Sequence, residues 1–221
     1  MYKVILLVLI TLLSAPAFAA DPPQTEEQKT LYALGHLVYR SIAAFQLSPA
    51  ELEVVKQGLT DAGSGKPSAV DLEVYGKKAQ EMARTRRKNQ ADKTASAGKA
   101  YEEKAAAEKG AVKTPSGLVY LSQKEGTGKR PGPADTVKVH YRGTLPDGKE
   151  FDSSYKRGTP AEFPLNGVIK CFSEGLQRMK VGGKAKLTCP SSIAYGEQGA
   201  GNVVPPGATL TFEIELLGIK E

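Results

Sequence analysis

Few side chains in this 221-residue chain have the chemistry of a covalent catalyst. His36 and His140 are its two histidines; the first lies in a helical pattern and the second on the outward side of a predicted strand. A Ser–His–Asp or Cys–His site would therefore lack its general base, and both histidines are expected to be exposed and inert. Two histidines and two cysteines, Cys171 and Cys189, are too few for most multi-ligand metal sites, so no metal is expected.

Two common signatures of phosphate binding and hydrolysis are also missing. No Gly-Lys pair is followed by Ser or Thr as a phosphate-binding loop requires, and the chain has no Gly-x-Ser-x-Gly motif. Either the chain catalyses a reaction that needs little covalent chemistry, or it is not a catalyst. We expect no cofactor.

The charge balance argues against a nucleic-acid partner. Thirty Lys and Arg face 24 Asp and Glu, for a net charge of +6, and the basic residues do not concentrate on one predicted face. The densest basic cluster consists of Arg84, Arg86, Arg87 and Lys88, and no aromatic residues interleave with it. It is better interpreted as the solvated face of a helix than as a phosphate-binding surface.

Residues 1–20 have the pattern of an export signal. Lys3 precedes an apolar run over 4–13, and the small residues of Ala17-Phe18-Ala19 follow. A membrane anchor is the alternative, but this run is shorter than the ~20 residues that span a bilayer, and no other apolar run approaches that length. We expect a protein exported to the bacterial periplasm, an oxidising compartment, with no membrane segment after cleavage.

The mature chain divides into a helical part and a strand-rich part. The latter, residues 111–221, holds 16 of the 23 Gly and 9 of the 14 Pro. A helical dimerisation region is expected over 21–67, with one capping box at Ser48–Glu51. A long solvated connecting helix follows over 68–110, beginning at Ser68. The first helix needs a partner for its apolar stripe, and a second copy of the chain is the preferred one. That stripe comprises Leu31, Leu34, Val38, Ile42 and Phe45.

Alternation of apolar and polar residues predicts half-buried strands in the C-terminal part. Such alternation covers 137–142, 184–189 and 210–216, and Pro146-Asp147-Gly148 predicts a turn. One short segment, 171–179, has helical spacing instead. Antiparallel strands with one short helix indicate the α+β class.

Five motifs in this part resemble those of the FKBP-type peptidyl-prolyl isomerases, in the same order and spacing. The resemblance covers about residues 112–220 and implies a twisted antiparallel sheet wrapped around a short helix, with an apolar cavity between them. The helical part is similar to the dimerisation domain of periplasmic FKBPs and macrophage-infectivity-potentiator-like proteins. The motifs are Val139-His140-Tyr141-Arg142-Gly143, Gly148-Lys149-Glu150-Phe151-Asp152-Ser153-Ser154, Val168-Ile169, Ala194-Tyr195-Gly196 and Val204-Pro205-Pro206-Gly207-Ala208-Thr209-Leu210.

The resemblance also implies the site. Its catalytic residues would be Asp152, Tyr195 and Phe151, and macrolides such as tacrolimus or rapamycin would be inhibitors. Phe172 stands where many family members carry Trp, so the pocket floor is expected to be deeper. The implied substrate-binding residues are Tyr141, Phe163, Val168, Ile169, Phe172, Val204 and Phe212.

In the fold that this resemblance implies, Cys171 begins the short helix and Cys189 points into the same interior. Two buried thiols are one possibility. An even cysteine count in an oxidising compartment favours the other, a disulfide between them.

Three functions stay open at this point. The leading one is a homodimeric isomerase that acts on Xaa-Pro segments of unfolded or partly folded exported proteins. The second is a holdase chaperone or binding module, and the third is a factor that binds host proteins; in both of these the isomerase activity would be secondary.

Overall fold

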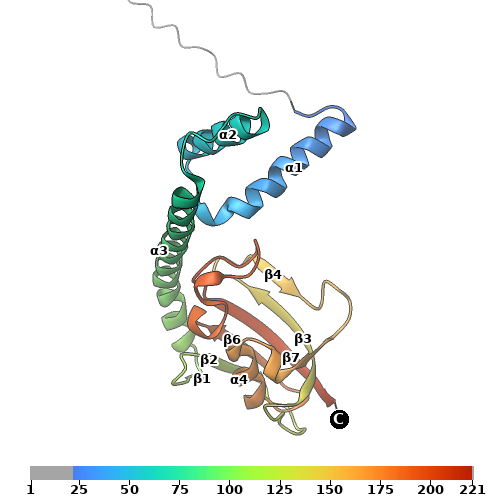
Figure 1. The fold of residues 1–221 in the computed structure, drawn as a ribbon. Coiled ribbons are helices and arrows are strands. Elements are labelled where there is room, and N and C mark those ends of the chain that lie inside the picture. Colours follow the sequence, from blue (N-terminus) through green and yellow to red (C-terminus); the bar gives the residue numbers. More distant parts are fainter. Residues whose placement is uncertain (1–21, 221) are drawn as a thin grey trace, which may run out of the picture. The chain divides into compact units, whose positions relative to one another are not determined.

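The computed structural model describes residues 22–220 and confirms the α+β class, with three α-helices before residue 107 and a sheet with one α-helix after residue 110 (Figure 1). The expected export signal, residues 1–20, lies outside the described residues. No helix within 22–220 is long and apolar enough to cross a membrane. The chain divides into two compact units, residues 1–43 and 44–221.

Helix α1 (Glu26–Ile42) belongs to the first unit and has no buried residue. It begins at a capping box formed by Thr25 and Gln28. Phe45, expected in the same helix, lies beyond it in a 3-10 turn (η1, Ala43–Phe45), because α1 ends three residues earlier. Helix α1 does not bury its own apolar side, and of the stripe residues within α1 only Ile42 is partly buried. More than half of the surface is exposed for Leu31, Tyr32, Leu34 and Leu37.

Helix α2 (Pro49–Gly63) begins at the capping box that the sequence predicts. The Glu51 carboxylate accepts a hydrogen bond from the Ser48 N–H at 2.8 Å, and it also pairs with Arg86 at 2.5 Å. The hydrogen bond from Arg86 lowers the pKa of Glu51 to about 2. Arg86 also donates to the Phe45 carbonyl at 2.7 Å. This arginine of the basic cluster is therefore a structural contact between helices.

Helix α3 (Leu72–Ala106) spans about 52 Å at 1.5 Å per residue. It begins four residues after Ser68, because Asp71 is the N-cap and accepts from the Glu73 and Val74 N–H groups. The expectation that its second half is solvated throughout is wrong. Small residues at intervals of seven are buried there, and they carry little hydrophobic signal in the sequence. They are Ala91, Gly98 and Ala105.

Seven antiparallel strands form one sheet, in the order β1-β2-β6-β7-β3-β4, and β5 pairs with the part of β3 that β4 leaves free. The long β3–β7 pair lies inside the sheet, between β6 and the edge formed by β4 and β5 (Figure 1). The strands are β1 (Ala111–Lys113), β2 (Val119–Lys124), β3 (Thr136–Thr144), β4 (Glu150–Ser153), β5 (Ala161–Pro164), β6 (Lys184–Cys189) and β7 (Leu210–Lys220).

The predicted alternation places one apolar row of each long strand in the core. The residues of that row on β3, β6 and β7 are almost completely buried, as period-two patterning requires. The turn at Pro146-Asp147-Gly148 is also confirmed, since the Gly148 N–H donates to the Leu145 carbonyl at 2.9 Å. The buried rows are Val137, Val139 and Tyr141; Ala185, Leu187 and Cys189; and Leu210, Phe212, Ile214 and Leu216.

Helix α4 (Lys170–Arg178) packs on the sheet and is joined to it by a disulfide. Cys171 in the first turn of α4 and Cys189 at the end of β6 have Cα atoms 5.8 Å apart, and both side chains are fully buried. The bridge lies directly beside Phe172. It therefore ties the start of α4 to the sheet.

We predict that reduction of this disulfide destabilises the strand-rich part of the chain by ~3 kcal/mol, the chain-entropy value for a loop of about 19 residues. Urea unfolding with and without reductant measures the difference. The matched control is the Cys171→Ala/Cys189→Ala variant, whose unfolding should not respond to reductant. Two alkylated thiols in non-reduced protein purified from an oxidising compartment would contradict the prediction.

Candidate active site

A pocket of about 290 Å³ lies between α4 and the sheet. Nine of the ten residues that the family resemblance implied for catalysis or substrate binding line it, together with Gly167. They come from β3, β4, β5, β7, the start of α4 and the loop after β6, so the fold brings distant parts of the chain together. They are Tyr141, Phe151, Asp152, Phe163, Val168, Ile169, Phe172, Tyr195 and Phe212.

Val204 is the one implied residue that is not among those lining this pocket. Its backbone pairs with Ala200 in a two-residue bridge, with N–H to carbonyl distances of 3.0 and 3.1 Å. The Val204 side chain is 3% exposed and belongs to the hydrophobic core. The bridge closes the loop between Ala200 and Val204.

Aromatic rings in edge-to-face contact form the pocket walls. Phe172 lies at the centre, with ring centroids 5.2 Å from Phe212, 5.7 Å from Tyr141 and 5.8 Å from Phe163. Phe151 packs on Phe212 at 5.6 Å. Edge-to-face contacts of this kind fix the orientation of each ring beyond what burial alone does. The walls are therefore rigid and apolar.

One corner of the pocket is polar, and a residue that the sequence reasoning missed completes it. The Tyr141 hydroxyl donates to the Asp152 carboxylate. Arg157 pairs with that carboxylate at 2.5 Å, donates to the Tyr141 hydroxyl at 2.9 Å, and lies over the Tyr141 ring at 5.5 Å. In the sequence, Arg157 could have been found as a basic residue five positions after Asp152. It lies in a turn in which the Gly158 N–H donates to the Tyr155 carbonyl.

The pKa values of these groups lie away from neutrality. Partial burial opposes ionisation of Asp152, but the hydrogen bond from Tyr141 and the contacts with Arg157 outweigh it, so the pKa of Asp152 is lowered. Burial, aided by the Asp152 carboxylate, raises the pKa of Tyr141 and that of Tyr195. At neutral pH the corner therefore holds an ion pair and neutral phenols.

Two groups at the pocket rim can bind a peptide backbone. Tyr195 is 36% exposed and lies between two 3-10 turns, η3 (Ser191–Ile193) and η4 (Gly196–Gln198). Ile169 is the residue before α4, and its N–H has no acceptor within residues 22–220. A phenol donor and a free N–H beside an apolar pocket suit the carbonyls of an extended chain.

Behind the pocket, His140 differs from the exposed residue that the pattern predicts. Its Nδ1 lies 3.0 Å from the Ser154 hydroxyl oxygen, and its ring stacks on Tyr155 with centroids 4.6 Å apart. The Ser154 hydroxyl also accepts from the Tyr141 N–H at 2.8 Å. His140 therefore supports the strand that carries Tyr141, and it does not line the pocket.

Other features of the described chain are weaker candidates. A depression along the outer side of α4 is lined mainly by polar side chains and has no aromatic wall. Within residues 22–220, no group of three His, Cys, Asp or Glu side chains is placed to hold a metal ion. The aromatic pocket is the site that can bind an apolar ring and orient the amide beside it.

Two family models and several relatives match this chain. The model described as FKBP-type peptidyl-prolyl cis-trans isomerase matches residues 128–217, and the domain amino terminal to that isomerase matches 27–121. The isomerase FkpA of Escherichia coli K12 is 38% identical over 220 residues, which cover 93% of this chain and 81% of that protein. The macrophage infectivity potentiator of Trypanosoma cruzi is 46% identical over 125 residues, covering 56% and 64%.

A solved structure agrees with these sequence matches. The crystal structure of FkpA from E. coli aligns with a TM-score of 0.66 at 37% identity, and the alignment covers 89% of this chain and 98% of that one. Both parts of the chain, helical and strand-rich, thus have counterparts in one relative. The chain belongs to the FKBP-type peptidyl-prolyl cis-trans isomerases.

Proposed function

We propose that this isomerase acts as a homodimer on Xaa-Pro segments of unfolded or partly folded exported proteins, without a cofactor. The aromatic pocket carries the proposal, because a proline ring fits an apolar pocket of about 290 Å³ whose one charged corner is internally neutralised. Export to the periplasm is supported by the pattern of residues 1–20. Macrolides such as tacrolimus or rapamycin would inhibit by filling the same pocket.

Catalysis of proline isomerisation needs no proton transfer. The X–Pro amide must twist through a barrier of ~18–20 kcal/mol, and in the twisted state it loses resonance and part of its dipole. The walls formed by Phe151, Phe172 and Phe212 solvate the planar, more polar amide less well than water does. The pocket therefore favours the twisted amide relative to the planar one.

The polar groups would hold the substrate while the amide turns. The Tyr195 hydroxyl and the Ile169 N–H donate to backbone carbonyls on either side of the rotating bond. Asp152 fixes the Tyr141 ring through its hydroxyl, and Arg157 keeps that carboxylate from presenting a net charge to the substrate. These residues orient the substrate and make no covalent bond to it.

The dimer would form through α1. Its exposed side chains Leu34 and Val38 lie on the apolar stripe, and a second α1 would bury this stripe in both copies. Two linked pockets raise the effective concentration of catalyst along one unfolded chain. The same exposed stripe also favours the holdase as a second function, because it offers an apolar surface of its own.

The first test replaces the pocket residues. Asp152→Ala and Phe151→Ala should each lower kcat/KM for a short Xaa-Pro peptide by about tenfold, equal to ~1.4 kcal/mol of transition-state stabilisation. Glu162→Ala is the matched control, since this carboxylate is exposed on β5 and pairs with Lys220 instead. Unchanged kcat/KM in both pocket variants, with a native circular dichroism spectrum, would remove these residues from the site.

The second test concerns the dimer. Leu34→Glu/Val38→Glu should yield monomers in size-exclusion chromatography with light scattering, because charges would enter the proposed seam between two α1 helices. Activity on a short peptide should stay within about twofold, while the acceleration of a refolding protein should fall further.

Lys29→Glu is the control for that variant, since Lys29 lies on α1 and is exposed beside Glu26. A dimer that survives the double substitution would mean that another surface joins the copies. If the double variant remains a dimer with unchanged peptide turnover but no longer suppresses aggregation, the holdase function of α1 is favoured.

A further inference from the structure

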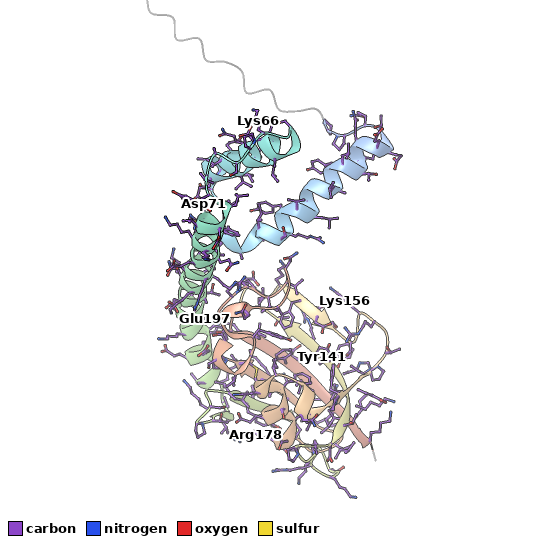
Figure 2. All side chains as sticks on the ribbon, viewed as in Figure 1. Lys66, Asp71, Tyr141, Lys156, Arg178 and Glu197 are labelled. Atoms are coloured by element: carbon purple, nitrogen blue, oxygen red, sulfur yellow. A yellow bond between two sulfur atoms is a disulfide. The ribbon has the colours of Figure 1, made fainter. Side chains whose placement is uncertain are left out.

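The second half of α3 is packed against the loop that carries Tyr195. We call this contact the α3 seam: on one side the buried helix residues Ala91 and Gly98, and on the other side residues 196–211. Figure 2 shows Glu197 of this loop beside α3, and its carboxylate lies 4.0 Å from Lys88. The helix is therefore part of the surroundings of the pocket.

Two glycines allow the helix and the loop to approach at backbone distance. A Cβ on Gly98 would overlap the hydroxyl oxygen of Thr209 and lie 3.1 Å from its Cβ. A Cβ on Gly207 would overlap the Ala91 backbone, with its Cα 2.7 Å away, and Gly207 also has φ +74°. At Gly207 no other residue fits without moving the backbone of the loop or the helix, and at Gly98 a larger residue would displace the Thr209 side chain.

Hydrogen bonds hold the two sides of the seam together. The Thr209 hydroxyl donates to Glu102 at 2.7 Å, and Arg87 donates to the Gln198 side chain at 2.8 Å. Thr209 is 1% exposed because α3 covers it. The seam thus holds both η4 and the start of β7.

A short backbone path leads from the seam to the pocket. The Gly207 N–H donates to the Gly196 carbonyl at 2.9 Å, and Gly196 directly follows Tyr195. The Gly199 N–H donates to the Tyr195 carbonyl at 3.1 Å. Movement of Gly207 away from Ala91 would therefore displace the residue at the pocket rim.

We propose that the α3 seam positions Tyr195 for substrate binding, with Gly98 and Gly207 as its positioning residues. This inference rests on the proposed role of Tyr195 in binding a substrate carbonyl. The catalytic unit then includes the helix from about residue 87 onward, and substrate affinity depends on a helix that contributes no atom to the pocket lining.

The test is a cycle of variants in the full-length protein, read out by the KM and kcat of an Xaa-Pro peptide. Gly98→Ala should raise KM by about 3- to 10-fold, the range for loss of one hydrogen bond, and leave kcat within about twofold. Hydrogen exchange of the amides of 196–207 should accelerate. Gly76→Ala is the matched control, because Gly76 lies on the same helix with nothing within 4 Å of its would-be Cβ.

Two further arms separate positioning from general destabilisation. Adding Thr209→Ala to Gly98→Ala removes the overlapping oxygen and should restore part of the lost affinity. In a Tyr195→Ala background, Gly98→Ala should raise KM no further. If Gly98→Ala does not fold, Arg87→Ala takes its place. It removes one seam contact without introducing a clash, and it should also raise KM.

Three results would overturn the proposal. The first is a wild-type KM in Gly98→Ala although hydrogen exchange of 196–207 is faster; if Gly98→Ala does not fold, the same result in Arg87→Ala counts instead. The second is that Gly98→Ala raises KM by the same factor in the wild-type and in the Tyr195→Ala background. A wild-type KM in Tyr195→Ala alone would overturn the role of Tyr195 as well, and that single variant distinguishes failure of the proposed site from failure of the seam.

Discussion

Helix α4 approaches β6 so closely that only glycine fits at the point of contact. A Cβ on Gly175 would overlap the Leu187 side chain, with Cδ2 at 2.7 Å. The disulfide joins the same helix to the same strand one turn earlier. This close contact places Phe172 under the central strands, where three other rings can meet it edge to face. If α4 stood farther from the sheet, the pocket would lose its floor and admit water.

Much of this arrangement can be predicted from the sequence, because burial leaves a regular trace. The period-two rows at 137–141, 185–189 and 210–216 predict strands, and Ser48 with Glu51 predicts a helix start. The pocket residues were found through motifs rather than through periodicity, since Phe151 or Phe212 alone reads as ordinary core. The sequence gives no sign of the backbone bridge between Val204 and Ala200, because that bridge depends on the local loop conformation.

Contacts that are made through small or polar side chains could not be predicted from the sequence. Ala91, Gly98 and Ala105 seat α3 on the sheet domain, yet alanine and glycine in a charged helix give no apolar stripe. The roles of Arg157 and His140 could not be predicted for a related reason. Their roles depend on partners that a turn or a neighbouring strand brings close, Asp152 in one case and Ser154 in the other.

The central claim is that the pocket accelerates rotation about an amide without transferring a proton. Its ionisable groups are Asp152, whose pKa is lowered, and Tyr141 and Tyr195, whose pKa values are raised, so none of the three changes charge near neutrality. The most direct test is kcat/KM for a short Xaa-Pro peptide from pH 6 to 8.5, in H₂O and in D₂O. The account predicts a flat profile and a solvent isotope effect near 1. A bell-shaped profile with an isotope effect of about 2 or more would show general acid–base catalysis and contradict it.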